Sequence, residues 1–176
     1  MRRRERRVLG VLLATAIVLP SAPALAATTK GGAESLTGAV VISGRSGTRS
    51  VVRSVIVARG AFNGVGRIVE VQNLPADPGN VSRDDLVFAE GTLHVVTKSS
   101  GPSLSMNPRT CAYDARARQT TTVEGGTGRF SAATGRFSGT VEAFGLATRE
   151  ADGSCTLKRA PLAELDALLS RGSLSP

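Results

Sequence analysis

The sequence predicts an all-β fold, an antiparallel sandwich or barrel, and three observations predict it. Short runs rich in β-branched and apolar residues recur about every 8–12 residues after residue 35. Glycine, proline, asparagine and aspartate separate these runs, as they do at hairpin turns. Strand-like and helical patterns do not alternate, which argues against a parallel sheet with helices on both faces.

The N-terminus has the pattern of a removable secretory signal peptide over residues 1–26. Residues 1–7 contain five arginines, residues 8–20 are uncharged, and the small-residue motif at residues 24–26 is typical of a cleavage site. The uncharged run is shorter than the roughly 20 residues that a membrane-spanning helix needs. We therefore expect cleavage near Ala26, a secreted single domain of residues 27–176, and no membrane anchor in the mature form. An uncleaved N-terminal anchor is the alternative.

Residues 27–176 are mildly basic and poor in aromatic side chains. The signal takes five of the 22 basic and one of the 14 acidic residues, which leaves 17 and 13 and a net charge of +4. This charge keeps a small protein soluble and is weak support for a polyanion partner. One tyrosine and no tryptophan provide few of the stacking platforms that single-stranded nucleic acids need, so no nucleic-acid partner is expected.

The two cysteines, Cys111 and Cys155, predict one disulfide bond. An even number of cysteines in an exported chain is typical of bridges, because the compartment is oxidising. Two free thiols or a metal pair are the alternatives. Closing the loop of about 45 residues between them stabilises a fold by about 4 kcal/mol in the chain-entropy model.

The first half of the domain contains three expected strands and a loop. The strands are expected at residues 36–43, 51–59 and 62–72, which are rich in β-branched and apolar residues. Residues 73–80 contain two prolines and a glycine and are expected to form a loop.

Two later runs alternate in polarity, as half-buried strands do. The first, residues 86–98, is expected to form one strand with Leu93 on the core side and His94 in solvent. The second, residues 110–123, places Cys111 on its apolar face, so the disulfide is expected on the core side.

The end of the chain is expected to form a short helix. Pro161 suits a first helical position, and Gly172 suits the end of a helix. The leucines that share one helical stripe are Leu162, Leu165 and Leu169. A helix of about ten residues is unstable alone, so it should pack on the sheet.

A glycine-rich stretch at residues 124–139 contains an internal repeat. Residues 127–131 return as residues 134–138, which predicts a strand, a turn and a second strand. The stretch resembles the Gly-Gly-[Ser/Thr]-Gly-x-[Phe/Tyr] signature of the allene oxide cyclase and dirigent barrel group. The matching residues are Gly125, Gly126, Thr127, Gly128, Phe130, Ala133, Gly135 and Gly139. The chain as a whole also resembles small secreted actinobacterial proteins.

This resemblance implies an antiparallel eight-stranded lipocalin-like (allene oxide cyclase-like) barrel. Such a barrel has room inside for side chains or for one small ligand. The catalytic acidic and arginine residues of the group have no match in this sequence. The resemblance therefore implies a fold, and it implies no active site or cofactor.

The residue types argue against a metal site, a cofactor and several catalytic chemistries. One histidine and two distant cysteines do not make a zinc site, and no acidic residues have calcium-ligand spacing. His94 lacks the nucleophile and orienting partner of a catalytic triad. The glycines at residues 125–128 lack the Gly-Lys-[Ser/Thr] sequence of a phosphate loop.

Glu142, Phe144 and Glu70 are the candidate ligand-binding residues. Glu142 and Phe144 share one face of an expected strand. If that face is the interior, the Glu142 carboxylate lies in an apolar cavity, where burial raises its pKa and suits it to acid–base chemistry. Glu70, between two valines, is a similar case. A partly exposed strand glutamate is the alternative for each.

Three functions follow from the sequence. The leading prediction is a secreted, disulfide-linked barrel that binds a small apolar ligand or an extracellular partner without catalysing a reaction. The alternative is an isomerase or cyclase of the allene oxide cyclase or dirigent type that uses a buried carboxylate. The third is a protein that binds an anionic polymer through arginines, and the candidates are Arg116, Arg118, Arg129 and Arg136.

Overall fold

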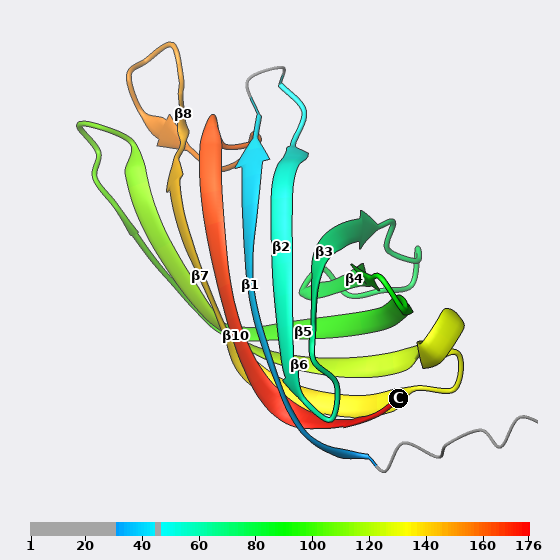
Figure 1. The fold of residues 1–176 in the computed structure, drawn as a ribbon. Helices are drawn as coiled ribbons and strands as arrows, with labels where there is room; N and C mark the ends of the chain where they lie inside the picture. The colour runs from blue at the N-terminus through cyan, green and yellow to red at the C-terminus, as the bar shows by residue number, and fades with distance from the viewer. Residues whose placement is uncertain (1–30, 45–46) are drawn as a thin grey trace, which may run out of the picture.

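The computed structural model describes residues 31–44 and 47–176. The predicted signal peptide, residues 1–26, lies outside the described residues. Eight antiparallel strands form a closed barrel (Figure 1), which confirms the all-β prediction and the eight-stranded antiparallel barrel. The barrel strands are β1 (Gly32–Ser43), β2 (Ser50–Gly60), β3 (Gly64–Val71), β4 (Val81–Phe88), β5 (Gly91–Met106), β6 (Ala112–Gly126), β7 (Thr134–Leu146) and β10 (Ala163–Ser175).

The barrel strands follow one another around the circle in sequence order. From β1 to β7 each strand pairs with the next, β7 pairs with β10, and the circle closes where β10 pairs with β1. Between β7 and β10 the chain forms a small hairpin of β8 (Thr148–Arg149) and β9 (Cys155–Thr156).

The C-terminal segment is a strand, so the predicted helix over residues 161–172 is wrong. β10 pairs with β1 on one side and with β7 on the other along its length. This pairing closes the barrel, and it outweighs the weak stability of a helix of about ten residues. Leu165 and Leu169, which the sequence pattern had placed on one helical stripe, are both exposed on the outer surface of the barrel. Leu168 and Leu174 face the core.

Residues 86–98, predicted to be one strand, form part of a hairpin. Phe88 ends β4, Gly91 begins β5, and these two residues pair across a two-residue turn. The two turn residues are neither glycine nor proline. Before the turn the even-numbered side chains of β4 face the core, and after it the odd-numbered side chains of β5 do. Within β5, Leu93 faces the core and His94 faces outward, as predicted.

The two ends of the barrel differ because β3 and β4 are short. Each has eight residues, whereas the other barrel strands have 11 to 16. In Figure 1 the strands β2, β1, β10 and β7 continue as a curved wall past β3 and β4. β2 and β3 pair only from Ile56 to Ala58, and beyond this point the Ser54 side chain bonds to the backbone of Ile68. We call this end of the barrel the open end.

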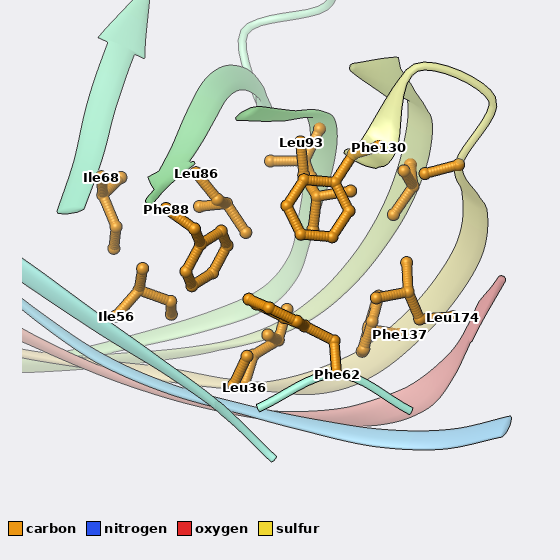
Figure 2. Packing of buried hydrophobic residues seen from close by; sticks show 14 of the residues in the cluster. Leu36, Ile56, Phe62, Ile68, Leu86, Phe88, Leu93, Phe130, Phe137 and Leu174 are labelled. Atoms are coloured by element: carbon orange, nitrogen blue, oxygen red, sulfur yellow. The ribbon is translucent and has the colours of Figure 1, made fainter. Parts of the chain in front are cut away.

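Phenylalanine side chains fill the opposite, closed end (Figure 2). Phe62 makes edge contacts with Phe88 and Phe130, with ring centroids 5.0 Å apart in each pair. Phe130 lies in the 3-10 turn η1 (Gly128–Phe130), so the first copy of the repeated sequence forms a turn where a strand was predicted. Glu34 completes this end, because its buried carboxylate accepts a hydrogen bond from the Phe62 N–H at 2.8 Å.

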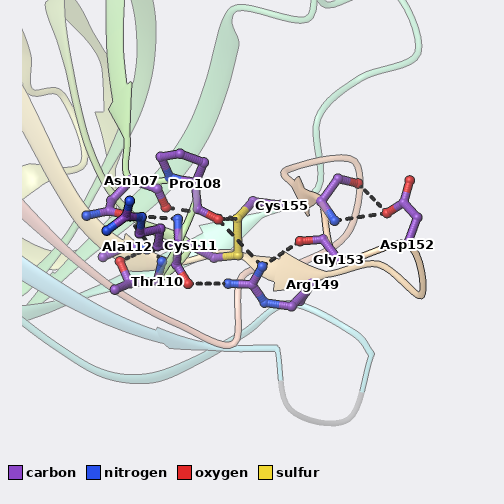
Figure 3. The surroundings of a disulfide bond; sticks show 11 residues. Asn107, Pro108, Thr110, Cys111, Ala112, Arg149, Asp152, Gly153 and Cys155 are labelled. Atoms are coloured by element: carbon purple, nitrogen blue, oxygen red, sulfur yellow. Dashed lines mark hydrogen bonds between the residues drawn. A yellow bond between two sulfur atoms is a disulfide. The ribbon is translucent and has the colours of Figure 1, made fainter.

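The predicted disulfide between Cys111 and Cys155 is confirmed (Figure 3). It joins the residue before β6 to β9, with Cα atoms 5.4 Å apart, and Cys111 is buried as predicted. The Arg149 guanidinium donates to the Arg109 carbonyl at 2.6 Å and also to the carbonyl of Gly153. The β8–β9 hairpin is therefore fixed against the β5–β6 turn at the open end.

Candidate functional site

The inner surface of the barrel changes from apolar at the closed end to polar at the open end. On β10, Leu174 lies in the buried core, and Asp166 and Glu164 lie further along the same inner face. This order follows from the alternation of side chains along a strand. The ionisable side chains of the open end, which we call the polar mouth, are Arg49, Glu70, Asp84, Tyr113, Glu164 and Asp166.

A partly enclosed cavity of about 60 Å³ lies inside the barrel. Its lining combines apolar side chains with hydroxyl, amide and carboxyl groups. The apolar lining residues are Leu36, Ile56, Ile68, Leu86, Val95 and Leu168, and the polar ones are Ser82, Asp84, Thr97, Gln119, Thr121 and Ser170. Sites that enclose a drug-sized ligand measure about 300–1,000 Å³. The cavity is therefore too small to enclose a whole molecule of that size.

Asp84 is the carboxyl group of the cavity wall. It lies on β4 with the same inward parity as Leu86, and the Ser82 hydroxyl donates a hydrogen bond to it at 3.2 Å. Burial raises the pKa of Asp84 to about 6, although the hydrogen bond from Ser82 opposes this shift. Asp84 therefore exchanges its proton close to neutral pH.

Asp166 contributes a second carboxyl group from β10. Its Oδ1 atom is buried and has no hydrogen-bond partner among the described residues. A buried polar atom without a partner is costly, so this oxygen is an unused bonding position inside the barrel. Burial, followed by the charge of Glu164, raises the pKa of Asp166 to about 7, while Arg49 opposes the shift.

Tyr113 and Glu164 form a hydrogen-bonded pair in the polar mouth. The Tyr113 hydroxyl on β6 donates to the Glu164 carboxylate on β10. Between them, the inward position of β7 is Gly145, which pairs with both residues in the sheet register. A Cβ atom at Gly145 would overlap the Tyr113 ring, so the glycine lets the ring lie across β7. Burial and the Glu164 carboxylate raise the pKa of Tyr113, which keeps its hydroxyl protonated.

Arg49 supplies the positive charge of the polar mouth. It pairs with Glu70 on β3, and the two side chains span the region where β2 and β3 separate. Arg49 and Glu70 both influence the pKa values of Asp84 and Asp166, so these four side chains form one electrostatic group. Because Arg49 and Glu70 are each about 40% exposed, this ion pair adds little to stability.

The predicted ligand-binding residues lie in different places. Glu70 belongs to the polar mouth. Glu142 and Phe144 face outward on β7: Glu142 pairs with Arg116 at 3.4 Å, and Phe144 is 51% exposed. The interior position that would have placed the Glu142 carboxylate in a cavity is therefore not found.

Sequence reasoning missed five residues of the polar mouth, and no sequence signal marked Arg49, which precedes β2. Asp166 and Glu164 were hidden because their segment was assigned to a helix. Asp84 has the parity of Leu86 and was detectable once that segment was recognised as a separate strand. Tyr113 was correctly placed on the inner face, but its partner Glu164 is 51 residues away in the sequence.

The remaining candidates lie on the outer surface. The His94 Nδ1 atom lies 2.7 Å from the Asp85 carboxylate on the outer face of the sheet. Arg116, Arg118 and Arg136 are exposed on β6 and β7, and the Arg129 guanidinium lies 5.3 Å from the centroid of the Phe62 ring. Binding of an anionic polymer by these arginines stays a prediction.

The described residues, 31–44 and 47–176, contain neither a metal-binding cluster nor a helix that could span a membrane. No group of three histidine, cysteine or acidic side chains there is arranged to hold a metal ion. No helix in that part of the chain is long and apolar enough to cross a membrane.

Comparison with known proteins gives no family assignment. No family model matches the chain, and neither a curated protein nor a solved structure is similar to it. The function is therefore inferred from the geometry of the barrel.

Proposed function

We propose that the protein is a secreted binding module that holds a small amphiphile inside a lipocalin-like barrel. The up-and-down order of strands, closed by β1 and β10, supports the lipocalin-like assignment. The apolar end of the ligand would lie against Leu36, Ile68 and Leu86 in the cavity. Its head group would lie in the polar mouth.

The observation that carries this proposal is the buried, unpartnered Oδ1 atom of Asp166, which lies one inward position along β10 from Leu168 in the cavity wall. A ligand that donates a hydrogen bond there would remove the cost of the unsatisfied oxygen. Glu70, Asp84, Glu164 and Asp166 face one compensating cation, Arg49, so the mouth favours a cationic head group. An amine with a short alkyl chain fits both requirements.

The test is a comparison of head groups on one alkyl chain. Octylamine, octanol and octanoate are titrated calorimetrically into the purified protein near pH 8. We expect octylamine to bind most tightly and octanoate not to bind, since carboxylates repel one another. Native mass spectra of the protein recovered from its medium would identify a retained natural ligand. Equal affinity for the three compounds would contradict the proposed role of the polar mouth.

A second function, acid–base catalysis of an isomerase or cyclase type, is favoured by one observation. The pKa values of Asp84 and Asp166 are raised to about 6 and about 7, which is the range in which a general acid or base works best. In this proposal Asp166 takes the role that the sequence had suggested for Glu142.

Recovery of the ligand distinguishes the two functions. A binding module returns its ligand unchanged after long incubation. A catalyst returns an isomer, and Asp166→Asn then abolishes conversion while binding of the product is retained. Conversion that persists in both Asp84→Asn and Asp166→Asn would exclude these carboxyl groups as the acid or base.

A further inference from the structure

The outer surface of β7, β10, β1 and β2 carries a cluster of exposed apolar side chains. Each of them is between 39% and 51% exposed. Its members, which we call the outer apolar face, are Val41, Val55, Phe144, Leu146, Leu165 and Leu169.

The strand register places five of these six side chains next to one another, all except Leu169. Leu165 on β10 lies opposite Phe144 on β7 and, on its other side, opposite Val41 on β1. One step further along, Ala39 on β1 lies opposite Val55 on β2. Leu169 lies further along the same face of β10, beyond Ala167 and between Thr37 and Thr140. The outer apolar face is therefore continuous from β7 to β2 around Leu165, with Leu169 at its edge.

This surface is unusual for a chain that has so few aromatic residues. Four of the five phenylalanines are buried at the closed end, and Phe144 alone among them is exposed. Together the six side chains expose on the order of 400 Å² of apolar area, a size at which patches commonly mark interaction sites.

Charges of opposite sign lie at the two edges of the outer apolar face. On the β2 edge, Arg53 lies opposite Val41. On the β7 edge, Glu142 lies two residues from Phe144 and opposite Ala167, and it pairs with Arg116 on β6. An apolar centre with a charged rim is the usual anatomy of a protein–protein interface.

We propose that the outer apolar face binds the same face of a second copy of this chain, in a two-fold symmetric dimer. An axis parallel to the strands and between β10 and β1 brings Leu165 of each copy over Val41 of the other. The same operation lays the β7 edge of one copy on the β2 edge of the other. Phe144 of each copy then lies over Arg53 of the other. The Glu142 carboxylate, which Arg116 of its own chain approaches at 3.4 Å, lies next to this second guanidinium.

The geometry of sheet packing allows this arrangement. Sheets stack face to face with strands within about 30° of each other and about 10 Å apart. The polar mouth uses the opposite, inward side chains of the same strands, Glu164 and Asp166, so the dimer leaves the open end accessible. The dimer is thus independent of the proposed ligand.

Sedimentation equilibrium of the purified protein tests the interface. We expect the wild type to form dimers, and Leu165→Glu to raise the dimer dissociation constant at least thirtyfold, because it buries a charge at the centre of the contact. Val65→Glu is the matched control, since Val65 is 67% exposed on β3, outside this face. It should dimerise as the wild type does. Circular dichroism and an intact disulfide would show that both variants fold.

A charge exchange tests the choice of a second copy as the partner. Arg53→Glu and Glu142→Arg should each weaken the dimer about tenfold. The double variant should recover part of the loss, because the cation introduced by Glu142→Arg also lies beside Arg116. Failure of the double variant to recover would overturn the proposed orientation. A wild type that is monomeric at every concentration would overturn the dimer. If that monomer sediments with phosphatidylcholine vesicles and Leu165→Glu does not, the face binds lipid instead.

Discussion

The Tyr113 hydroxyl donates a hydrogen bond to the Glu164 carboxylate across the inner face of β7, where Gly145 leaves room for the ring. Three strands therefore define one contact in the polar mouth. Neither partner could adopt this geometry if the strand between them carried an inward side chain.

Gly145→Ala should displace Tyr113 and break its bond to Glu164. We expect a loss of about 1–3 kcal/mol in the free energy of unfolding, because an added methyl group forces the ring to move. Urea denaturation measures this loss. Gly79→Ala is the control, since a Cβ atom there meets no neighbour within 4 Å. Equal stability of the two variants would show that the ring is not confined by Gly145.

The stability of the fold should fall as the pH rises from about 4 to about 7. Folding raises the pKa of Asp84 to about 6 and that of Asp166 to about 7, so the native state binds these protons more tightly than the unfolded chain. The stabilisation is present while both protons are bound, and it is lost as the pH passes the folded-state values.

Urea denaturation at several pH values measures this dependence. Asp166→Asn should reduce the decline and should stabilise the protein at pH 8, because it removes a buried charge. Asp114→Asn, an exposed substitution on the outer face of β6, should retain the wild-type decline. A wild type whose stability increased steadily through this range would contradict the burial of Asp84 and Asp166.

Reduction of the Cys111–Cys155 disulfide should destabilise the protein by about 4 kcal/mol, because the bond closes a loop of 44 residues. The β8–β9 hairpin should loosen first, since Arg149 and the disulfide hold it. Hydrogen exchange with and without reductant would measure this. Protection of Thr148 and Thr156 that survives reduction would show that the hairpin is stable without the bond.

Two phenylalanines should respond differently to the same substitution. Phe130→Ala removes a fully buried ring from the closed end and should cost about 3–5 kcal/mol. Phe144→Ala removes an exposed ring and should change the unfolding free energy of the monomer by less than about 0.5 kcal/mol. Thermal denaturation of dilute protein measures both. Comparable losses would contradict the assignment of Phe144 to the outer surface.

Local patterns in the sequence were enough to predict several strands and one covalent bond. The alternation after residue 110 placed Cys111 and Tyr113 inward, and both are buried. These predictions succeeded because side-chain direction within a strand depends only on parity.

The remaining features depend on contacts between distant parts of the chain. The leucines of β10 fit a helical stripe as well as a strand whose outer face is apolar, and pairing with β1 and β7 decides between them. The turn between Phe88 and Gly91 contains no glycine or proline that would mark it. The local sequence pattern allows either Glu142 or Asp166 to face the interior. In the barrel, the Glu142 side chain faces outward and the Asp166 side chain faces inward.

The central claim is that Asp166 holds the head group of a ligand inside the barrel. Calorimetric titration of octylamine into the wild type and Asp166→Asn, each near pH 6 and pH 8, tests it most directly. We predict that wild-type affinity rises with pH as the carboxyl group ionises, and that Asp166→Asn binds at least tenfold more weakly at pH 8 and has lost most of the pH dependence. Affinity that is the same in both proteins, at both pH values, would contradict the claim.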